Sequence, residues 1–304
     1  MKRVLSFCLV ILLLGGLIYF FREDINSFLY QKYILDEIKI SDFNPNEYYR
    51  KKDYEFVQIT NDFEAKDKKH LLNIYYTIIN SGAENFTFRC DIEYKECLDD
   101  VAEISKDQSV LSYINSFIHP FNGFSSVETL YDNLGKVELI VSKAYTDEEI
   151  SIIKNKMQTI INTINNTSNN EKIIIKNVHD YIINNTKYDK ERSDNNIIKY
   201  KSDLAYGALI EGYALCGGYT DSMALFLDYY NIPNFKISSD NHIWNAVYLN
   251  GEWRHLDLTW DDPVTTSGRD LLEYNFFLID DNELKTQDLT EHTYDIDIYK
   301  EFAK

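Results

Sequence analysis

The chain is poor in basic residues. Its 304 residues include 31 lysines and arginines against 49 aspartates and glutamates, which gives a formal net charge of −18. Such an acidic chain repels phosphate backbones, so nucleic acid is not an expected partner. Hydrophobic residues make up 44% and charged residues 26% of the chain, a composition typical of folded proteins. The length suffices for one large domain or two smaller ones.

Cysteine is scarce as well. The four cysteines include no C-x-x-C pair and no zinc-finger spacing, so the sequence predicts no structural zinc site. Cys90 and Cys97 are seven residues apart and form either a disulfide or two unpaired thiols, because spacing alone does not establish their geometry. Cys8 lies in an apolar N-terminal run. Cys216 is left as the odd cysteine.

One long stretch without charge stands at the N-terminus. Residues 4–21 are uncharged and follow Lys2 and Arg3, and an apolar run of this length can just span a bilayer. A small-residue cleavage site is not evident, so we expect residues 1–24 to form a transmembrane signal anchor, with a cleaved secretory signal as the alternative. The preceding positive charges favour a single-pass protein of the cell membrane whose remaining chain lies outside the cytoplasm.

Residues 25–145 mix strand-like and helix-like segments and carry no recognisable motif. We interpret them as a small α+β domain that serves as a spacer or positions the substrate. The expected strands cover 54–59, 85–92 and 136–143, and the expected helices cover about 66–80 and 106–118.

A second domain is expected over 146–304. Thr146 and Glu149 form a capping box ahead of apolar residues at helical spacing, and Ser168 and Glu171 form another. These patterns predict two consecutive helices joined by a short polar loop.

The helix that follows begins beside Cys216. The stretch 212–230 reads GYALCGGYTDSMALFLDYY, and its apolar residues recur on one helical face: Tyr219, Met223, Phe226, Leu227 and Tyr230. Cys216 falls at the first turn, where unpaired backbone N–H groups and the helix dipole favour a thiolate. The alternative is a small core cysteine beside a tight turn.

A predicted hairpin supplies a histidine and an aspartate. Residues 242–259 contain two alternating runs separated by Asn-Gly at 250–251, the strongest short-range hairpin signal. The two-residue loop sets a register that places Trp244 opposite Asp257, so His242 and Asp257 become diagonal neighbours on one face. The opposite face is expected to be the core face: Ile243, Val247, Leu249, Leu256 and Leu258.

Together these positions predict a site for nucleophilic catalysis. Asp257 can accept the imidazole N–H of His242 and fix its tautomer, which leaves the other nitrogen for the thiol of Cys216. Trp244 would shield this site from water or simply pack. The alternative is that His242 is a surface residue and Asp257 merely starts a turn.

Two stretches resemble the bacterial transglutaminase-like superfamily. They read CGGYTDSMALFLDYYNIP and DNHIWNAVYLNGEWRHLDLTWDDP, and the resemblance covers roughly residues 170–265. It implies a papain-like α+β fold in which the helix carrying the cysteine packs on an antiparallel sheet carrying the histidine and aspartate. By the same resemblance Cys216 is the nucleophile, His242 the general base and acid, and Asp257 the residue that orients the imidazole.

Other polar residues have weaker assignments. Tyr206 is a candidate second donor of the oxyanion hole, beside the Cys216 backbone N–H, and Tyr188 and Trp244 are candidates for the cleft wall. His179 is expected on a solvated helix face. No metal site and no cofactor are predicted.

The sequence thus predicts a membrane-anchored, extracytoplasmic cysteine enzyme that acts on amide bonds through a thioester. Its expected substrates are proteins, peptides or cell-wall components. It would be a cysteine protease or amidase, or a protein-glutamine acyltransferase, with hydrolysis slightly favoured. The alternative function is a non-catalytic transglutaminase-like module that binds peptides or cell-wall components.

Overall fold

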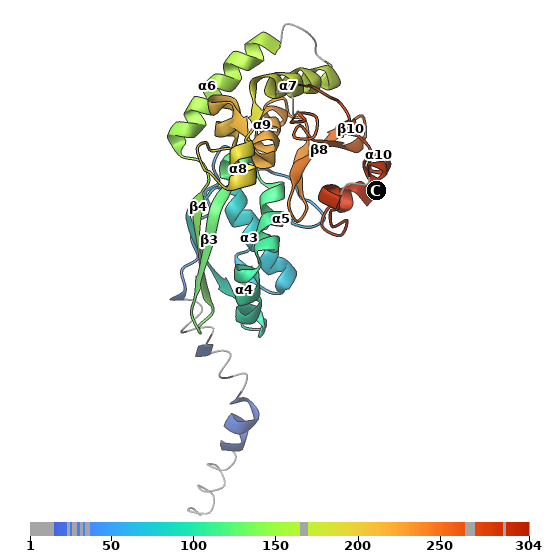
Figure 1. The fold of residues 1–304 in the computed structure, drawn as a ribbon. Helices are drawn as coiled ribbons and strands as arrows, with labels where there is room; N and C mark the ends of the chain where they lie inside the picture. Colours follow the sequence, from blue (N-terminus) through green and yellow to red (C-terminus); the bar gives the residue numbers. More distant parts are fainter. Residues whose placement is uncertain are drawn as a thin grey trace, which may run out of the picture.

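A computed structural model describes residues 15–22, 25, 29–30, 33, 37–164, 170–264, 271–287 and 290–303. Two four-stranded sheets, each with its own helices, make up the folded body (Figure 1). The first sheet lies with α3, α4 and α5, and the second lies with α6, α7 and α9. Their apolar side chains are continuous, because one buried cluster contains residues of both parts. The described chain is an α+β protein.

The first sheet has the strand order β1-β2-β4-β3. The β1–β2 pair is parallel and the other pairs are antiparallel. A disulfide joins Cys90 at the end of β2 to Cys97 at the start of α4. The elements of this part are β1 (Glu64–Ala65), α3 (Lys68–Asn80), β2 (Asn85–Cys90), α4 (Cys97–Lys106), α5 (Gln108–Phe117), η2 (Pro120–Asn122), β3 (Phe124–Tyr131) and β4 (Lys136–Lys143).

One prediction for this part is wrong, and one strand was missed. Residues 54–59 form no strand, because polar side chains take up their backbone N–H groups: Gln58 N donates to Asn73 Oδ1 at 2.9 Å and Ile59 N to Asp53 Oδ1 at 2.8 Å. Strand β3 was not predicted. It is an edge strand with mostly exposed or half-buried residues, so it lacks the alternation that marks a half-buried strand.

The second sheet is antiparallel and has the strand order β10-β9-β8-β7. A short parallel pair, β5 with β6, leads into the helix that begins at Cys216. The elements are α6 (Asp147–Ile164), α7 (Glu171–Asn185), β5 (Lys187–Tyr188), α8 (Lys190–Asn195), the π-helical turn η3 (Gly207–Glu211), β6 (Tyr213–Ala214), α9 (Cys216–Tyr229), β7 (Asn234–Ser238), β8 (Ile243–Leu249), β9 (Glu252–Leu256), β10 (Phe277–Ile279), α10 (Asp281–Thr286), η4 (Thr290–His292) and η5 (Lys300–Ala303).

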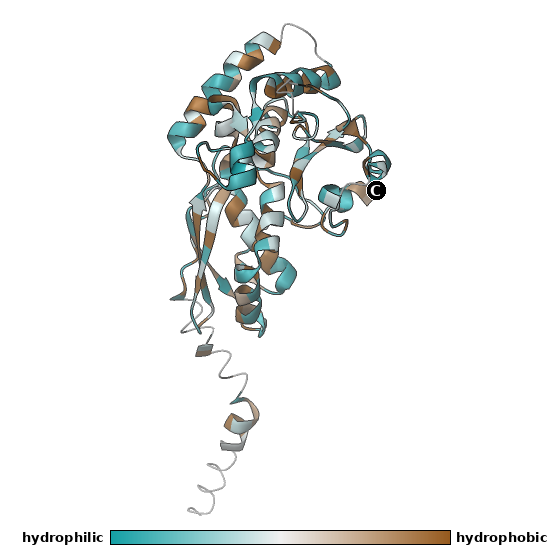
Figure 2. Ribbon diagram, viewed as in Figure 1, coloured by the Kyte–Doolittle hydropathy of each residue, from teal (hydrophilic) through white to brown (hydrophobic). Residues whose placement is uncertain are grey.

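The capping predictions have mixed outcomes. Glu149 N donates to Thr146 Oγ1 at 3.2 Å and Thr146 N donates to Glu149 Oε2 at 3.0 Å, which confirms the first capping box. The next helix is capped by Asn170, whose Oδ1 accepts from Ile173 N, and Ser168 lies outside the described residues. Figure 2 shows hydrophobic and hydrophilic residues alternating along α6, as its predicted spacing requires.

The predicted hairpin register is confirmed. Leu249 pairs with Glu252 and Asn245 with Leu256, and both loop residues have positive φ, 54° at Asn250 and 90° at Gly251. Both faces of the hairpin are buried, however. Leu249 and its neighbours pack against α6, α7 and α9, whereas Trp244 joins the cluster shared with the first sheet.

The predicted transmembrane helix is wrong for the residues that the structure describes, since none of their helices is long and apolar enough to cross a membrane. Residues 1–14, which hold much of the apolar run, lie outside the described residues. The fold class therefore loses its N-terminal transmembrane helix. The signal anchor, the single-pass location at the cell membrane and the placement of the remaining chain outside the cytoplasm depended on that helix and are withdrawn with it.

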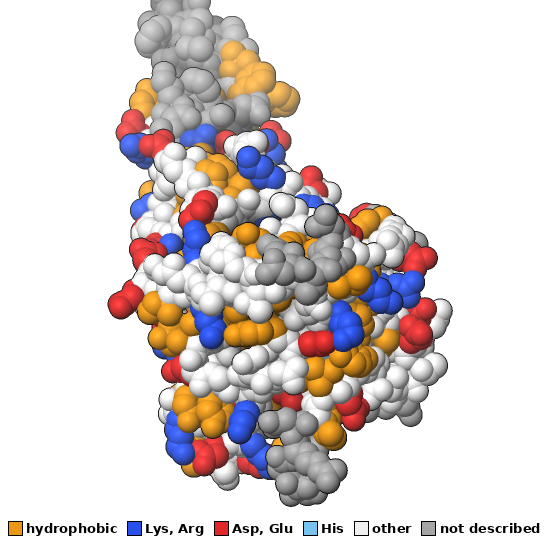
Figure 3. Space-filling view, turned by 90° about the horizontal axis from the view of Figure 1, so that it is seen from above, with side chains coloured by type: hydrophobic (Ala, Val, Ile, Leu, Met, Phe, Trp, Pro, Cys, Tyr) orange, Lys and Arg blue, Asp and Glu red, His pale blue; other side chains and the backbone are white. Residues whose placement is uncertain are grey.

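The surface is mixed in character. On the face shown in Figure 3, acidic and basic side chains of the described residues are interspersed among hydrophobic and neutral ones. The described residues on this face therefore form no extended track of one charge sign for a polyanion to follow.

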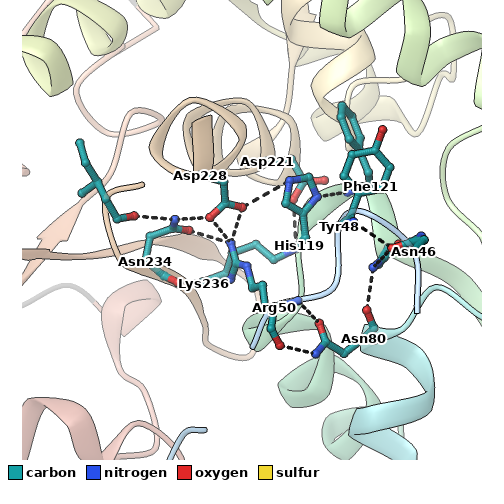
Figure 4. A network of polar contacts seen from close by, with 12 residues as sticks. Asn46, Tyr48, Arg50, Asn80, His119, Phe121, Asp221, Asp228, Asn234 and Lys236 are labelled. Atoms are coloured by element: carbon teal, nitrogen blue, oxygen red, sulfur yellow. Dashed lines mark hydrogen bonds and ion pairs between the residues drawn. The ribbon is translucent and has the colours of Figure 1, made fainter. Parts of the chain in front are cut away.

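Arg50 ties the two parts of the body together (Figure 4). Its guanidinium donates to Asp228 Oδ2 of α9 at 2.7 Å and to the main-chain oxygen of Asn234 in β7 at 3.2 Å. Its backbone N–H donates to Asn80 Oδ1 at the end of α3. Burial lowers the pKa of Arg50, but the nearby Asp228 carboxylate outweighs burial and raises it. The ion pair is shielded from water, with side chains 11% and 22% exposed.

We expect Arg50→Ala to lower the free energy of unfolding by about 3 kcal/mol, because it leaves Asp228 without its charged partner. Chemical denaturation of the full chain measures this loss. Lys66→Ala is the control, since it breaks an exposed pair with Asp62 and should change stability little. Equal losses in both variants would contradict a special role for Arg50.

Candidate active site

Cys216 is the first residue of α9, with Leu215 as an extended N-cap residue. Leu215 N donates to the main-chain oxygen of Ser202 at 2.7 Å, so the segment around Ser202 crosses close to the helix start. Glycine is required next to the cysteine for the same reason: a Cβ on Gly217 would lie 2.6 Å from the Asp203 carbonyl oxygen, and one on Gly218 would collide with that of Ser202. Cys216 is half-buried as a residue.

Two hydrogen bonds fix α9 against β8. Thr220 Oγ1 donates to the Ile243 carbonyl oxygen at 2.9 Å, and Asn245 Nδ2 donates to the Thr220 carbonyl oxygen at 3.0 Å. Since Thr220 lies one turn beyond Cys216 and Ile243 follows His242, these bonds hold the helix start beside the imidazole.

The structure brings the three predicted residues close together. His242 Nε2 lies 2.5 Å from Asp257 Oδ2, and the side chain of Cys216 is near enough to the same imidazole to raise its pKa. Because Nε2 is engaged by the carboxylate, Nδ1 is the nitrogen that remains for the thiol. The Trp244 indole stacks under the ring with centroids 5.6 Å apart. Imidazole and carboxylate are buried, with side chains 4% and 1% exposed.

The Asp257 carboxylate accepts four hydrogen bonds. Oδ2 takes His242 Nε2 and, at 2.8 Å, His292 Nε2. Oδ1 accepts the backbone N–H groups of Thr259 at 2.9 Å and Trp260 at 3.4 Å. These donors explain how an ionised group is tolerated at a buried position.

Burial and pairing act in opposite directions on the two central groups. Burial lowers the pKa of His242, but the Asp257 carboxylate and the nearby Cys216 side chain outweigh burial and raise it to about 10. Burial raises the pKa of Asp257, but the charge and hydrogen bonds of His242 and His292 outweigh burial and hold it well below its ordinary range. The pair therefore favours imidazolium and carboxylate over their neutral forms.

His292 was not predicted. It ends η4, in a C-terminal segment that lies 35 residues beyond Asp257 and carries no motif. Nothing in its local sequence distinguishes it from any other histidine. Only the tertiary path of residues 290–303 brings it to the site.

The other candidates occupy varied places. Tyr188 pairs with Ala214 in the β5–β6 ladder, two residues from the nucleophile candidate, and its hydroxyl donates to Ser193 Oγ at 3.3 Å. The Tyr206 ring lies 5.8 Å from Lys201 Nζ. Trp244 is fully buried, so it packs beneath the imidazole and does not line an open cleft. The oxyanion and cleft roles of the two tyrosines stay predictions.

His179 does not lie on a solvated face, contrary to prediction. Its side chain is fully buried between two carboxylates, with Nδ1 3.0 Å from Asp180 Oδ1 and Nε2 3.2 Å from Asp261 Oδ2. Asp261 Oδ1 in turn accepts the N–H of Phe276 at 2.9 Å. This arrangement holds the turn that follows Asp257 against α7.

Among the described residues, one group has the donor types of a metal site: His242, Asp257 and His292, whose donor atoms lie within 4.8 Å of one another. Both Nε2 atoms approach the same carboxylate oxygen at 2.5 and 2.8 Å. Ligands about 2.0–2.2 Å from a tetrahedral zinc ion stand farther apart than this. The geometry therefore fits shared protons better than a shared metal.

Comparisons with known proteins give little further support for the resemblance to the transglutaminase-like superfamily. No family model matches the chain, and no curated protein matches it significantly. A solved structure described as a TGase matches with a TM-score of 0.35 and 14% sequence identity. The match covers 49% of this chain and 47% of that one, so the chain spans about half the length of the matched protein. This likeness hints at a transglutaminase-like fold and is too weak to carry an argument.

The two shifted pKa values predict a stability profile. The pKa of His242 rises from 6.5 to about 10. Its contribution to folding stability is therefore full below about pH 6.5 and is lost as the pH approaches 10. The pKa of Asp257 is lowered from 3.8, so its contribution is present above about pH 4 and is lost in more acidic solution. We therefore expect the stability difference between wild type and His242→Gln to be largest between about pH 4 and 6.5.

Chemical denaturation of both proteins across this range measures the difference. Above about pH 6.5 it should shrink by up to about 1.4 kcal/mol per pH unit. Parallel profiles for the two proteins would show that His242 is not held as an imidazolium.

Proposed function

We propose that this chain is a cysteine enzyme that acts on amide bonds of proteins, peptides or cell-wall components through a thioester intermediate. The observation that supports the proposal is that Cys216, at the start of α9, lies beside the His242 imidazole, which is hydrogen-bonded to Asp257. Cys216 is only half-buried and can meet a substrate, while the buried imidazole and carboxylate keep their geometry.

In the first step, the Cys216 sulfur attacks the amide carbonyl carbon and a C–S bond forms. The oxyanion of the tetrahedral intermediate is accommodated by the backbone N–H of Cys216, at the positive end of the helix dipole. His242, holding the thiol proton, donates it to the leaving nitrogen as the C–N bond breaks. Asp257 keeps the imidazole oriented and stabilises its charged form.

In the second step, water attacks the thioester and gives a proton to His242. The C–S bond breaks, and the sulfur recovers that proton. The products are a carboxylic acid and the amine released earlier. We favour water over an amine as the second nucleophile because water needs no binding site of its own.

Alkylation of Cys216 by iodoacetamide tests the pairing on which the proposal depends. We expect rapid alkylation near neutral pH in wild type and markedly slower alkylation in His242→Ala, which removes the group that shares the thiol proton. Peptide mapping assigns the adduct to Cys216. His70→Ala is the control, because His70 lies on α3 and bonds to Thr60 and Asp62. A thiol that is sluggish in wild type and unaffected by His242→Ala would instead indicate a non-catalytic binding module.

Glutamine-containing peptides, incubated with and without a labelled amine, test the second nucleophile. We expect conversion of side-chain or backbone amides to acids, with little incorporation of the amine, and mass spectrometry distinguishes the products. Cys216→Ser should lower turnover by at least about a hundredfold. Efficient incorporation of the amine would overturn the preference for hydrolysis and assign the chain to acyl transfer.

A further inference from the structure

His292 occupies a place on the candidate site that none of the sequence motifs provides. We propose that His292 is a positioning residue. It holds Asp257 Oδ2 beside His242 Nε2 and, like His242, donates a hydrogen bond to that oxygen. A role of His292 in catalysis rests on the proposed function. The contact between His292 Nε2 and Asp257 Oδ2, at 2.8 Å, is present in the structure whatever the function is.

The chemistry of the partner fixes the direction of this hydrogen bond. An ionised carboxylate only accepts, so His292 must carry its proton on Nε2 and donate it to Asp257. The other ring nitrogen, Nδ1, has no hydrogen-bond partner among the described residues, and the side chain is 2% exposed. The ring stacks on Phe276 with centroids 4.9 Å apart and meets the Trp244 ring edge-on at the same distance. The Asp257 bond is thus its one described polar contact.

Other contacts anchor the C-terminal segment that delivers His292. Tyr299 is fully buried, and its hydroxyl oxygen accepts the N–H of Ser238 at 2.9 Å. Ser239 Oγ donates to the Glu291 carbonyl oxygen at 2.6 Å, next to His292, and the Tyr294 hydroxyl donates to Asp281 at 2.7 Å. The segment therefore stays in place without the imidazole, so a substitution at His292 tests the hydrogen bond itself.

Two donors on one oxygen weaken each other. Because Oδ2 also accepts the N–H of His292, it is a weaker acceptor for the N–H of His242. His292 therefore weakens the hydrogen bond between Asp257 and the His242 imidazole. The remaining titratable groups packed around these three are Cys216 of α9, His255 of β9, Asp261 after β9 and Asp281 of α10. Within the described part of the chain, none of these four side chains forms a hydrogen bond or ion pair with Asp257 Oδ2, whose partners are His242 and His292.

The experiment compares His292→Met, which has no donor, with His292→Gln, whose side-chain N–H has a similar reach. Proton NMR of the full chain follows the signal of the proton that His242 shares with Asp257. We expect it to move downfield in His292→Met and to stay at its wild-type position in His292→Gln. Hydrolysis of the acetyl-enzyme formed with p-nitrophenyl acetate should slow about tenfold in His292→Met, as for loss of one charge-assisted hydrogen bond, and be largely restored in His292→Gln.

An unmoved proton signal in His292→Met would overturn the proposal, as would equal impairment of both variants, which would assign the effect to ring shape. Thermal unfolding verifies that each variant is folded. If His292→Met does not fold, His292→Asn replaces it, because its shorter amide falls short of Oδ2. A wild-type protein that forms no acetyl-enzyme would refute the proposed function, while the proton signal would still decide the role of His292.

Discussion

The buried charge of Asp257 is the constraint on which the candidate site depends. A carboxylate with 1% of its side chain exposed is tolerated only if its lone pairs are occupied by good donors, because an uncompensated buried charge costs several kcal/mol. Asp257 obtains four donors from three stretches of chain: His242 ahead of β8, the Thr259 and Trp260 N–H groups after β9, and His292 in η4. Satisfying this one charge therefore fixes the relative positions of three segments.

Each of these segments is supported in turn by contacts away from the carboxylate. The turn after β9 is held to α7 through His179 and Asp261. The start of β8 is held to α9 through Thr220, which also places Cys216 beside the imidazole. The C-terminal segment is held by Tyr299. A site built in this way does not depend on one flexible loop, as precise positioning of a nucleophile and its base requires.

The sequence predicted those parts of this arrangement that local chemistry determines. Asn-Gly at 250–251 allows positive φ at both positions, so the hairpin register, and with it the proximity of His242 and Asp257, followed from a few residues. The N-terminal position of Cys216 on its helix followed from apolar spacing. His292 and the buried state of His179 could not be predicted, because both depend on which distant segment packs against them. The run 54–59 had strand-like side chains, but neighbouring Asn and Asp side chains compete for its backbone N–H groups.

The contacts of the first sheet's helices argue against an inert spacer. Phe117 of α5 packs on Phe235 of β7 with ring centroids 5.4 Å apart, and Tyr299 stacks on Phe235 from the C-terminal segment. Trp244, which lies under the His242 ring, belongs to the same buried cluster as the residues of the first sheet. Close-packed side chains transmit displacements instead of absorbing them. The first part of the body therefore forms the wall against which the imidazole is held, and changes there should reach the site through Phe235 and Trp244.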